Sequence, residues 1–167
     1  MSTGTIQINL SRALKLKNRV VHRIGQLDGL ITRYNSTPED NQEYDVRELY
    51  EARASLAGRL VGLKAAISRA NQPVQSLIFE LAELKSLIVM LGRIDTKNGP
   101  VTEGYPPTRV VYVAQFRKAE VDREVRRVER EIDRIQNELD QFNYRTVIDV
   151  DNVLFADEEP GPPPYEL

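Results

Sequence analysis

Residues 121–142 repeat apolar side chains at alternating steps of four and three, and nearly every position between them is charged. The repeat consists of Val121, Val125, Val128, Ile132, Ile135, Leu139 and Phe142. This heptad spacing is typical of a coiled-coil stripe on an otherwise solvated helix. Such a stripe packs against another helix and forms no pocket, so the strongest signal in the sequence concerns assembly and not catalysis.

The composition favours long aliphatic helices. Charged residues make up 29% of the 167 positions, aromatic residues only 7%, and there is no Trp. The 23 basic and 25 acidic residues give a net charge of −2, so no overall field steers the chain toward nucleic acid or an anionic membrane. Because there is no Cys, disulfides, thiolate metal sites and a cysteine nucleophile are excluded together.

Neither a secretory signal nor a membrane span is expected. Residues 1–10 lack a basic start ahead of an apolar run, and the longest apolar run, residues 87–91, is far shorter than the roughly 18 residues that a span needs. We therefore expect a cytoplasmic protein, or one within a virion assembled in the cytoplasm.

The first two helices are predicted from apolar residues at the helical period. The first begins at Asn9 or Ser11 as the N-cap and ends near Tyr34, and the second spans about residues 45–70. Beside the apolar stripe of the second helix lies a ridge of small residues at steps of four, namely Ala54, Gly58, Gly62 and Ala66. A ridge of this kind lets another backbone approach closely. Packing against the first helix is the ordinary interpretation, and a subunit contact is the alternative.

A third helix follows the stop signal at residues 71–73 and continues to about Ile94. It is apolar on more than one side, so we expect it to be the central helix of the core. Residues 95–108 are rich in Gly and Pro and are predicted to be an irregular connection. The charged helix at residues 121–142 is then the fourth.

Two short strands are predicted on either side of the fourth helix, at residues 109–113 and 145–150. They are expected to pair with each other as an antiparallel ribbon. The predicted fold is therefore mainly α: a four-helix antiparallel bundle with a small two-stranded β appendage, over residues 1–156. Residues 157–167 are predicted to be an acidic, Pro-rich extended tail.

No residue constellation specifies a reaction, a cofactor or a metal. His22 is the only His, which excludes a multi-histidine site within one chain. Asp149, Asp151 and the acidic residues 157–159 lack the spacing of a calcium loop, and Gly58 and Gly62 do not form a phosphate loop. The arginines of the fourth helix alternate with acidic residues, so salt bridges along the helix are expected in place of phosphate binding.

The tail contains Pro162, Pro163, Pro164 and Tyr165, which match the Pro-Pro-x-Tyr ligand of WW domains. Four residues match easily by chance. A linker, or a tail that docks on a neighbouring subunit, is the preferred interpretation.

A family resemblance rests on four landmarks, namely residues 10–14 (LSRAL), residues 67–71 (ISRAN), residues 143–146 (NYRT), and the strand at 110–113 followed by the heptad helix. In these landmarks the chain resembles the septicolysin-like family of small, mostly helical, uncharacterised bacterial proteins. The chain departs from the family pattern at Gln72-Pro73 and in its Pro-rich tail. The family name implies a cytolysin, and the resemblance transfers no catalytic or ligand residue.

The expected function is a non-catalytic, self-associating helical scaffold or structural subunit, whose partners are its own copies or neighbouring subunits. The interaction surfaces are the fourth-helix stripe, the small-residue ridge and the docking tail. One alternative is a bacteriophage structural or decoration protein with a docking C-terminal arm, and another is a membrane-active, cytolysin-like protein. An enzyme would need a polar cluster, for which Tyr112, Tyr144 and Asp149 near the ribbon are the candidates.

Overall fold

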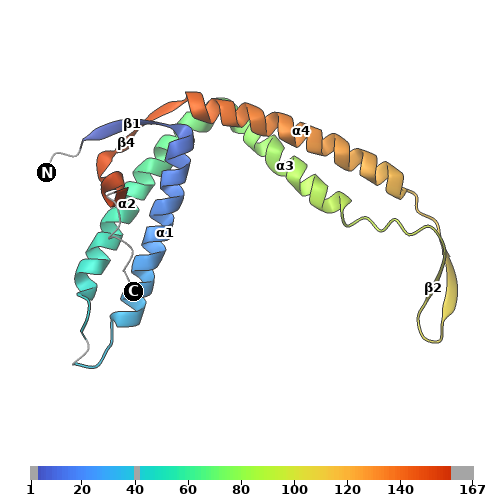
Figure 1. The fold of residues 1–167 in the computed structure, drawn as a ribbon, viewed down its shortest axis with the longest axis horizontal. Coiled ribbons are helices and arrows are strands. Elements are labelled where there is room, and N and C mark those ends of the chain that lie inside the picture. The colour runs from blue at the N-terminus through green and yellow to red at the C-terminus, as the bar shows by residue number, and fades with distance from the viewer. Residues whose placement is uncertain (1–3, 40–41, 159–167) are drawn as a thin grey trace, which may run out of the picture. The chain divides into compact units, whose positions relative to one another are not determined.

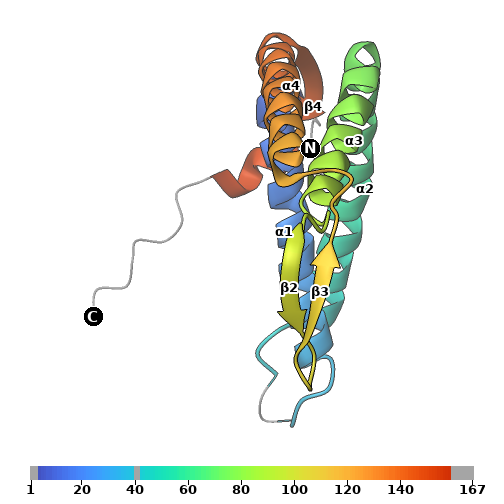
Figure 2. The same cartoon turned by 90° about the vertical axis from the view of Figure 1, so that its right-hand side faces the viewer.

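The computed structural model describes residues 4–39 and 42–158. The described chain is mainly helical, with two small antiparallel sheets of two strands each. It divides into two compact units, residues 1–73 with 141–167 and residues 74–140. Figures 1 and 2 show the elements of each unit.

Unit 1 is built around an antiparallel helix pair. Helix α1 (Leu10–Tyr34) and helix α2 (Val46–Asn71) lie side by side in both views (Figures 1 and 2). The predicted N-cap at Asn9 is confirmed, because its Oδ1 accepts a hydrogen bond from the Arg12 N–H at 2.9 Å. Asp45 caps α2 in the same way, through the N–H groups of Arg47 and Glu48.

A two-stranded sheet completes unit 1. Strand β1 (Thr5–Asn9) pairs antiparallel with strand β4 (Val147–Asp151), and a 3₁₀ segment, η2 (Asn152–Glu158), follows β4. The core combines residues of both helices, both strands and η2: Ile8, Leu10, Ala13, Leu16, Val20, Leu60, Leu63, Ile67, Val150 and Leu154. Apolar burial from five separate segments therefore holds this unit together.

An ion pair joins α2 to β4 within unit 1. The Arg59 guanidinium donates to Asp151 Oδ2. Asp151 Oδ1 accepts a hydrogen bond of 3.0 Å from the N–H of Val153, in the first turn of η2. Both side chains of the pair are about 30% exposed. Asp151 thus serves two contacts with one carboxylate.

We predict that Asp151→Ala lowers the free energy of unfolding by about 1–2 kcal/mol, because it removes a charged partner and an acceptor from a half-buried position. Asp149→Ala is the matched control, since Asp149 lies on the same strand but is exposed, and it should change stability by less than about 0.5 kcal/mol. Urea unfolding followed by circular dichroism measures both changes. Equal effects at the two positions would show that the Arg59 contact is not stabilising.

Unit 2 is built around a second helix pair. Helix α3 (Gln75–Leu91) packs against helix α4 (Lys118–Arg145), whose last five residues belong to unit 1. Between them strand β2 (Gly99–Glu103) pairs with strand β3 (Thr108–Tyr112) as an antiparallel hairpin. Its turn uses Gly104 at φ +81°, a backbone conformation that favours glycine.

The predicted pairing of the two strands is wrong. The strand at 109–113 is found as β3, but it pairs with β2; the strand at 145–150 is found as β4, but it pairs with β1. The physical reason is that only the short turn at residues 104–107 lies between β2 and β3, so these two strands close as a hairpin, whereas the 28 residues of α4 stand in the sequence between β3 and β4. The expectation that residues 95–108 are irregular is also wrong, because β2 lies within them.

The stop between the second and third helices is a single 3₁₀ turn, η1 (Gln72–Val74), with no loop on either side. In the described chain the α-helices, together with η1, therefore form three uninterrupted runs, 10–34, 46–91 and 118–145. The structure shows two antiparallel helix pairs with separate cores.

Candidate interaction surfaces

The heptad stripe of α4 is already covered within the chain. Val121, Val128, Ile135 and Leu139 are buried. Val121 and Val128 form a cluster with Leu91 of α3, joined by half-buried Val125 and Ile132 of α4 and by Leu84, Leu87 and Ile88 of α3. Phe142, at the end of the stripe, packs against the core of unit 1. The stripe is thus an intramolecular contact, which leaves it no apolar side for a second copy.

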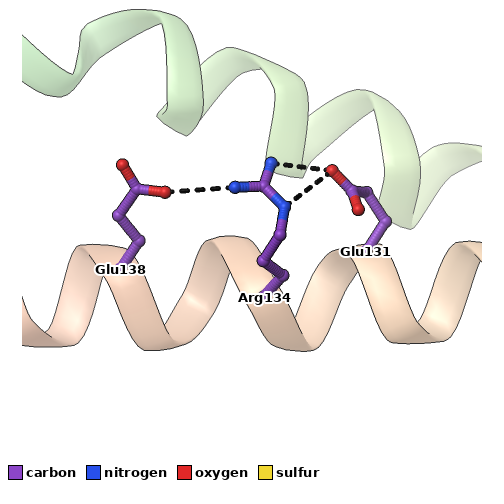
Figure 3. A network of polar contacts seen from close by, with 3 residues as sticks. All are labelled: Glu131, Arg134 and Glu138. Atoms are coloured by element: carbon purple, nitrogen blue, oxygen red, sulfur yellow. Dashed lines mark hydrogen bonds and ion pairs between the residues drawn. The ribbon is translucent and has the colours of Figure 1, made fainter.

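The rest of α4 carries paired charges. Arg134 bridges two carboxylates one turn away on either side: Nη2 lies 2.7 Å from Glu131 Oε1 and Nη1 lies 3.2 Å from Glu138 Oε2 (Figure 3). The hydrogen bond from Arg134 lowers the pKa of Glu131, and the same bond raises the pKa of Arg134. Of the two pairs that the i,i+3 and i,i+4 spacing predicts, Glu124 with Arg127 is present at 2.8 Å, whereas Asp122 pairs with Lys118 and not with Arg126. Salt bridges along the helix are therefore confirmed.

The small-residue ridge of α2 is open. Ala54, Gly58 and Gly62 are exposed and Ala66 is half-buried. A Cβ atom added at Gly58 or Gly62 would meet no heavy atom within 4 Å. Packing of the ridge against α1, the ordinary interpretation, is therefore wrong, because α1 covers the other side of α2. The neighbouring Val61 is 67% exposed, so this side of α2 is small and apolar over about three turns.

Within unit 2, helix α3 has an apolar side that α4 does not cover. At 100° per residue, Ile78, Phe79, Ala82, Val89 and Met90 lie opposite the residues that pack on α4. Phe79 is 63% exposed and Val89 is 53% exposed. Within unit 2 only Leu91 of α3 is buried, so the expectation that this helix is central to the core stays a prediction. We call these five residues the free face of α3.

A polar network holds the base of the β2–β3 hairpin. Lys97 Nζ donates to Glu103 Oε1 at 2.7 Å, and the Tyr112 hydroxyl donates to Glu103 Oε2 at 2.6 Å. The hydrogen bond from Lys97, followed by that from Tyr112, lowers the pKa of Glu103 from its ordinary 4.5. The bonds to Glu103 raise the pKa values of Lys97 and Tyr112.

These shifts predict a pH window for the hairpin. Because the pKa of Glu103 is lowered on folding, its contribution is present above about pH 4.5 and is lost as the pH falls through the lower folded value. Because the pKa values of Tyr112 and Lys97 are raised, their contributions are present below about pH 10 and are lost as the pH rises further. Cross-strand NMR contacts between β2 and β3 should weaken at both ends. Glu103→Gln should abolish the weakening of these contacts at low pH. Weakening that persists in this variant would show that another group causes it.

An aromatic cleft lies where α1 ends and α2 begins. Tyr34 and Tyr44 have ring centroids 4.7 Å apart at a tilt of 57°. They line a cleft of about 690 Å³, and Tyr50 lines an adjoining cleft of about 370 Å³. The two share Asn35, Val46 and Arg47. Sequence reasoning missed this site, because the three tyrosines have no periodicity and stand on both sides of a loop.

The other predicted residues do not converge on a site. Tyr112 and Asp149 lie in different sheets, and Tyr144 is 74% exposed. His22 contacts Gln26, one turn away. Among the described residues no group of three or more His, Asp or Glu is arranged to hold a metal ion. The tail residues Pro162, Pro163, Pro164 and Tyr165 lie outside the described residues.

Within the described chain no helix combines the length and the apolar character that crossing a membrane requires. Comparison with protein-family models, curated proteins and solved structures finds no match for the chain.

Proposed function

We propose that the protein is a non-catalytic helical scaffold or structural subunit that self-associates through the free face of α3. The carrying observation is the exposure of Phe79 and Val89 on a helix that is apolar on two opposite sides. Exposed apolar side chains favour burial against a partner, and α4 covers only one of the two apolar sides of α3. The other side therefore needs a partner.

A second copy of α3 fits this face. On this side of α3 the residues at heptad spacing are Phe79, Ala82 and Val89 of the free face together with Ser86, so the side chains along it are large, small, small and large. An antiparallel copy centred on Leu84 brings Phe79 opposite Val89 and Ala82 opposite Ser86, so each layer is matched. Two α3–α4 pairs joined in this way form a four-helix bundle from two copies of the chain.

The size of the face sets the strength of the contact. The 17 residues of α3 extend about 26 Å, and at a helix width of about 10 Å they offer on the order of 250 Å² per copy. Stable interfaces bury about 800 Å² per partner. We therefore expect a weak dimer whose population depends on protein concentration. In a larger assembly, the exposed small-residue side of α2 provides a further contact.

Sedimentation velocity over a wide concentration range tests the proposal. A monomer–dimer equilibrium supports it. A single monomeric species up to about 1 mM contradicts it. A dimer that is not detected at this concentration has a binding free energy weaker than about −4 kcal/mol. A virion subunit is one setting for such a scaffold, and copurification with an assembled particle would place it there.

The free face of α3 also favours a second candidate, the membrane-active protein that the septicolysin-like resemblance implies. That function needs a helix whose apolar side is not buried, and α3 is such a helix. Dye release from liposomes separates the two candidates. A self-associating scaffold leaves the vesicles intact, whereas a membrane-active protein empties them.

A further inference from the structure

The aromatic cleft of unit 1 presents hydrogen-bond donors beside exposed rings. Among the described residues, neither the Asn35 amide group nor the Arg47 guanidinium makes a side-chain hydrogen bond or an ion pair with another side chain. Both line the space between the Tyr34–Tyr44 ring pair and Tyr50. Tyr50, one turn after Arg47 on α2, is 63% exposed. The cleft therefore combines apolar ring faces with donors and has room above them.

Such a surface fits a polyproline segment. A proline has no N–H, and the polyproline helix makes no internal hydrogen bonds, so its carbonyl groups need donors from outside. Its rings pack on aromatic side chains, which is how aromatic-lined grooves recognise Pro-rich peptides. The chain itself contains one segment of this composition, Pro160-Gly161-Pro162-Pro163-Pro164-Tyr165.

We propose that residues 160–165 dock in the cleft lined by Tyr34, Tyr44 and Tyr50 of the same chain. The segment is uncharged, so its docking buries no ionised group. Glu43 and Glu51, which also line the cleft, repel the acidic residues on both sides of the segment, 157–159 and Glu166, so the docked length is limited to the uncharged residues between them. The inference concerns a different surface from the free face of α3 and stands independently of the proposed function.

The docking is within reach in one chain. Val153 of η2 shares a shallow pocket with Leu27 of α1 and with Leu56 of α2, in the same unit as the cleft. Leu56 is ten residues from Val46, or about 15 Å along the helix. The seven residues from 159 to 165 span about 22 Å as a polyproline helix. Tyr50 is only six residues from Leu56, or about 9 Å along the helix, and the five residues of η2 after Val153 add at most about 10 Å. The tail is therefore long enough to bring its prolines to Tyr50.

Backbone ¹⁵N relaxation of the full chain tests the proposal, with the Gly161 and Tyr165 amides as probes because the prolines carry none. Docking predicts order parameters above about 0.6 for both amides, and free motion predicts lower values. Tyr50→Ala should lower them below that level. Tyr144→Ala, which removes another exposed tyrosine outside the cleft, should leave them unchanged.

A second variant changes the tail instead of the cleft. Replacing Pro162, Pro163 and Pro164 together by Ala should shift the side-chain signals of Asn35 and Arg47 and leave those of Val61 in place. Order parameters below about 0.6 in the unmodified chain, with no response to Tyr50→Ala, overturn the proposal. Ordering that grows with protein concentration places the tail on a second copy and overturns docking within one chain.

Discussion

Leu16→Ala should lower the free energy of unfolding by about 3 kcal/mol, the effect of deleting a fully buried leucine from a core that relaxes only partly. Leu16 has no exposed area and belongs to the cluster that joins α1, α2, β4 and η2. Since small domains are stable by only about 5–15 kcal/mol, this single change removes a large part of the total. Urea unfolding followed by circular dichroism measures it.

The matched control is Val61→Ala on α2. Val61 is 67% exposed, so its truncation should change stability by less than about 0.5 kcal/mol. A comparable loss at both positions would mean that the outer side of α2 is covered in solution, which would point to a subunit contact at the small-residue ridge. A negligible loss at Leu16 would contradict the core of unit 1.

The helices could be predicted because their signals are local. An apolar period near 3.6, with the cap Asn9 at the start of α1, places α1 and α2 within a residue or two of their observed bounds. β3 and β4 were located by β-branched runs in the same way. β1 was missed because only Ile6 and Ile8 alternate in it, and β2 because its Gly99-Pro100 start is typical of a turn.

The pairing of elements was beyond local reasoning. β3 is followed in the sequence by the 28-residue helix α4. The strand with which β3 pairs therefore cannot be inferred from the next strand along the chain. The stripe of α4 predicted a partner helix, and only the fold identifies α3 as that partner within the chain. The double apolar character of α3 was visible in the sequence, but the side left uncovered was not, because coverage is a property of packing.

Val89→Glu should weaken self-association of the protein at least tenfold. The position lies near one end of the free face of α3, and a carboxylate there must lose water when two copies meet. Tenfold corresponds to about 1.4 kcal/mol, less than the full cost of burying an unpaired charge, because part of the side chain can reach solvent at the edge of a narrow contact. Sedimentation velocity between about 10 μM and about 1 mM covers the range in which so small an interface dissociates.

Val21→Glu is the control, because Val21 is a similarly exposed valine on α1, outside the free face. It should leave the equilibrium unchanged, and an equal loss for both variants would assign the effect to net charge. The antiparallel arrangement adds a sharper test. Its two-fold axis keeps each edge of the helix on the same side, so Glu83 meets Glu83 of the second copy and Lys85 meets Lys85. Added salt screens both repulsions and should strengthen the dimer; weakening by salt would rule out this arrangement.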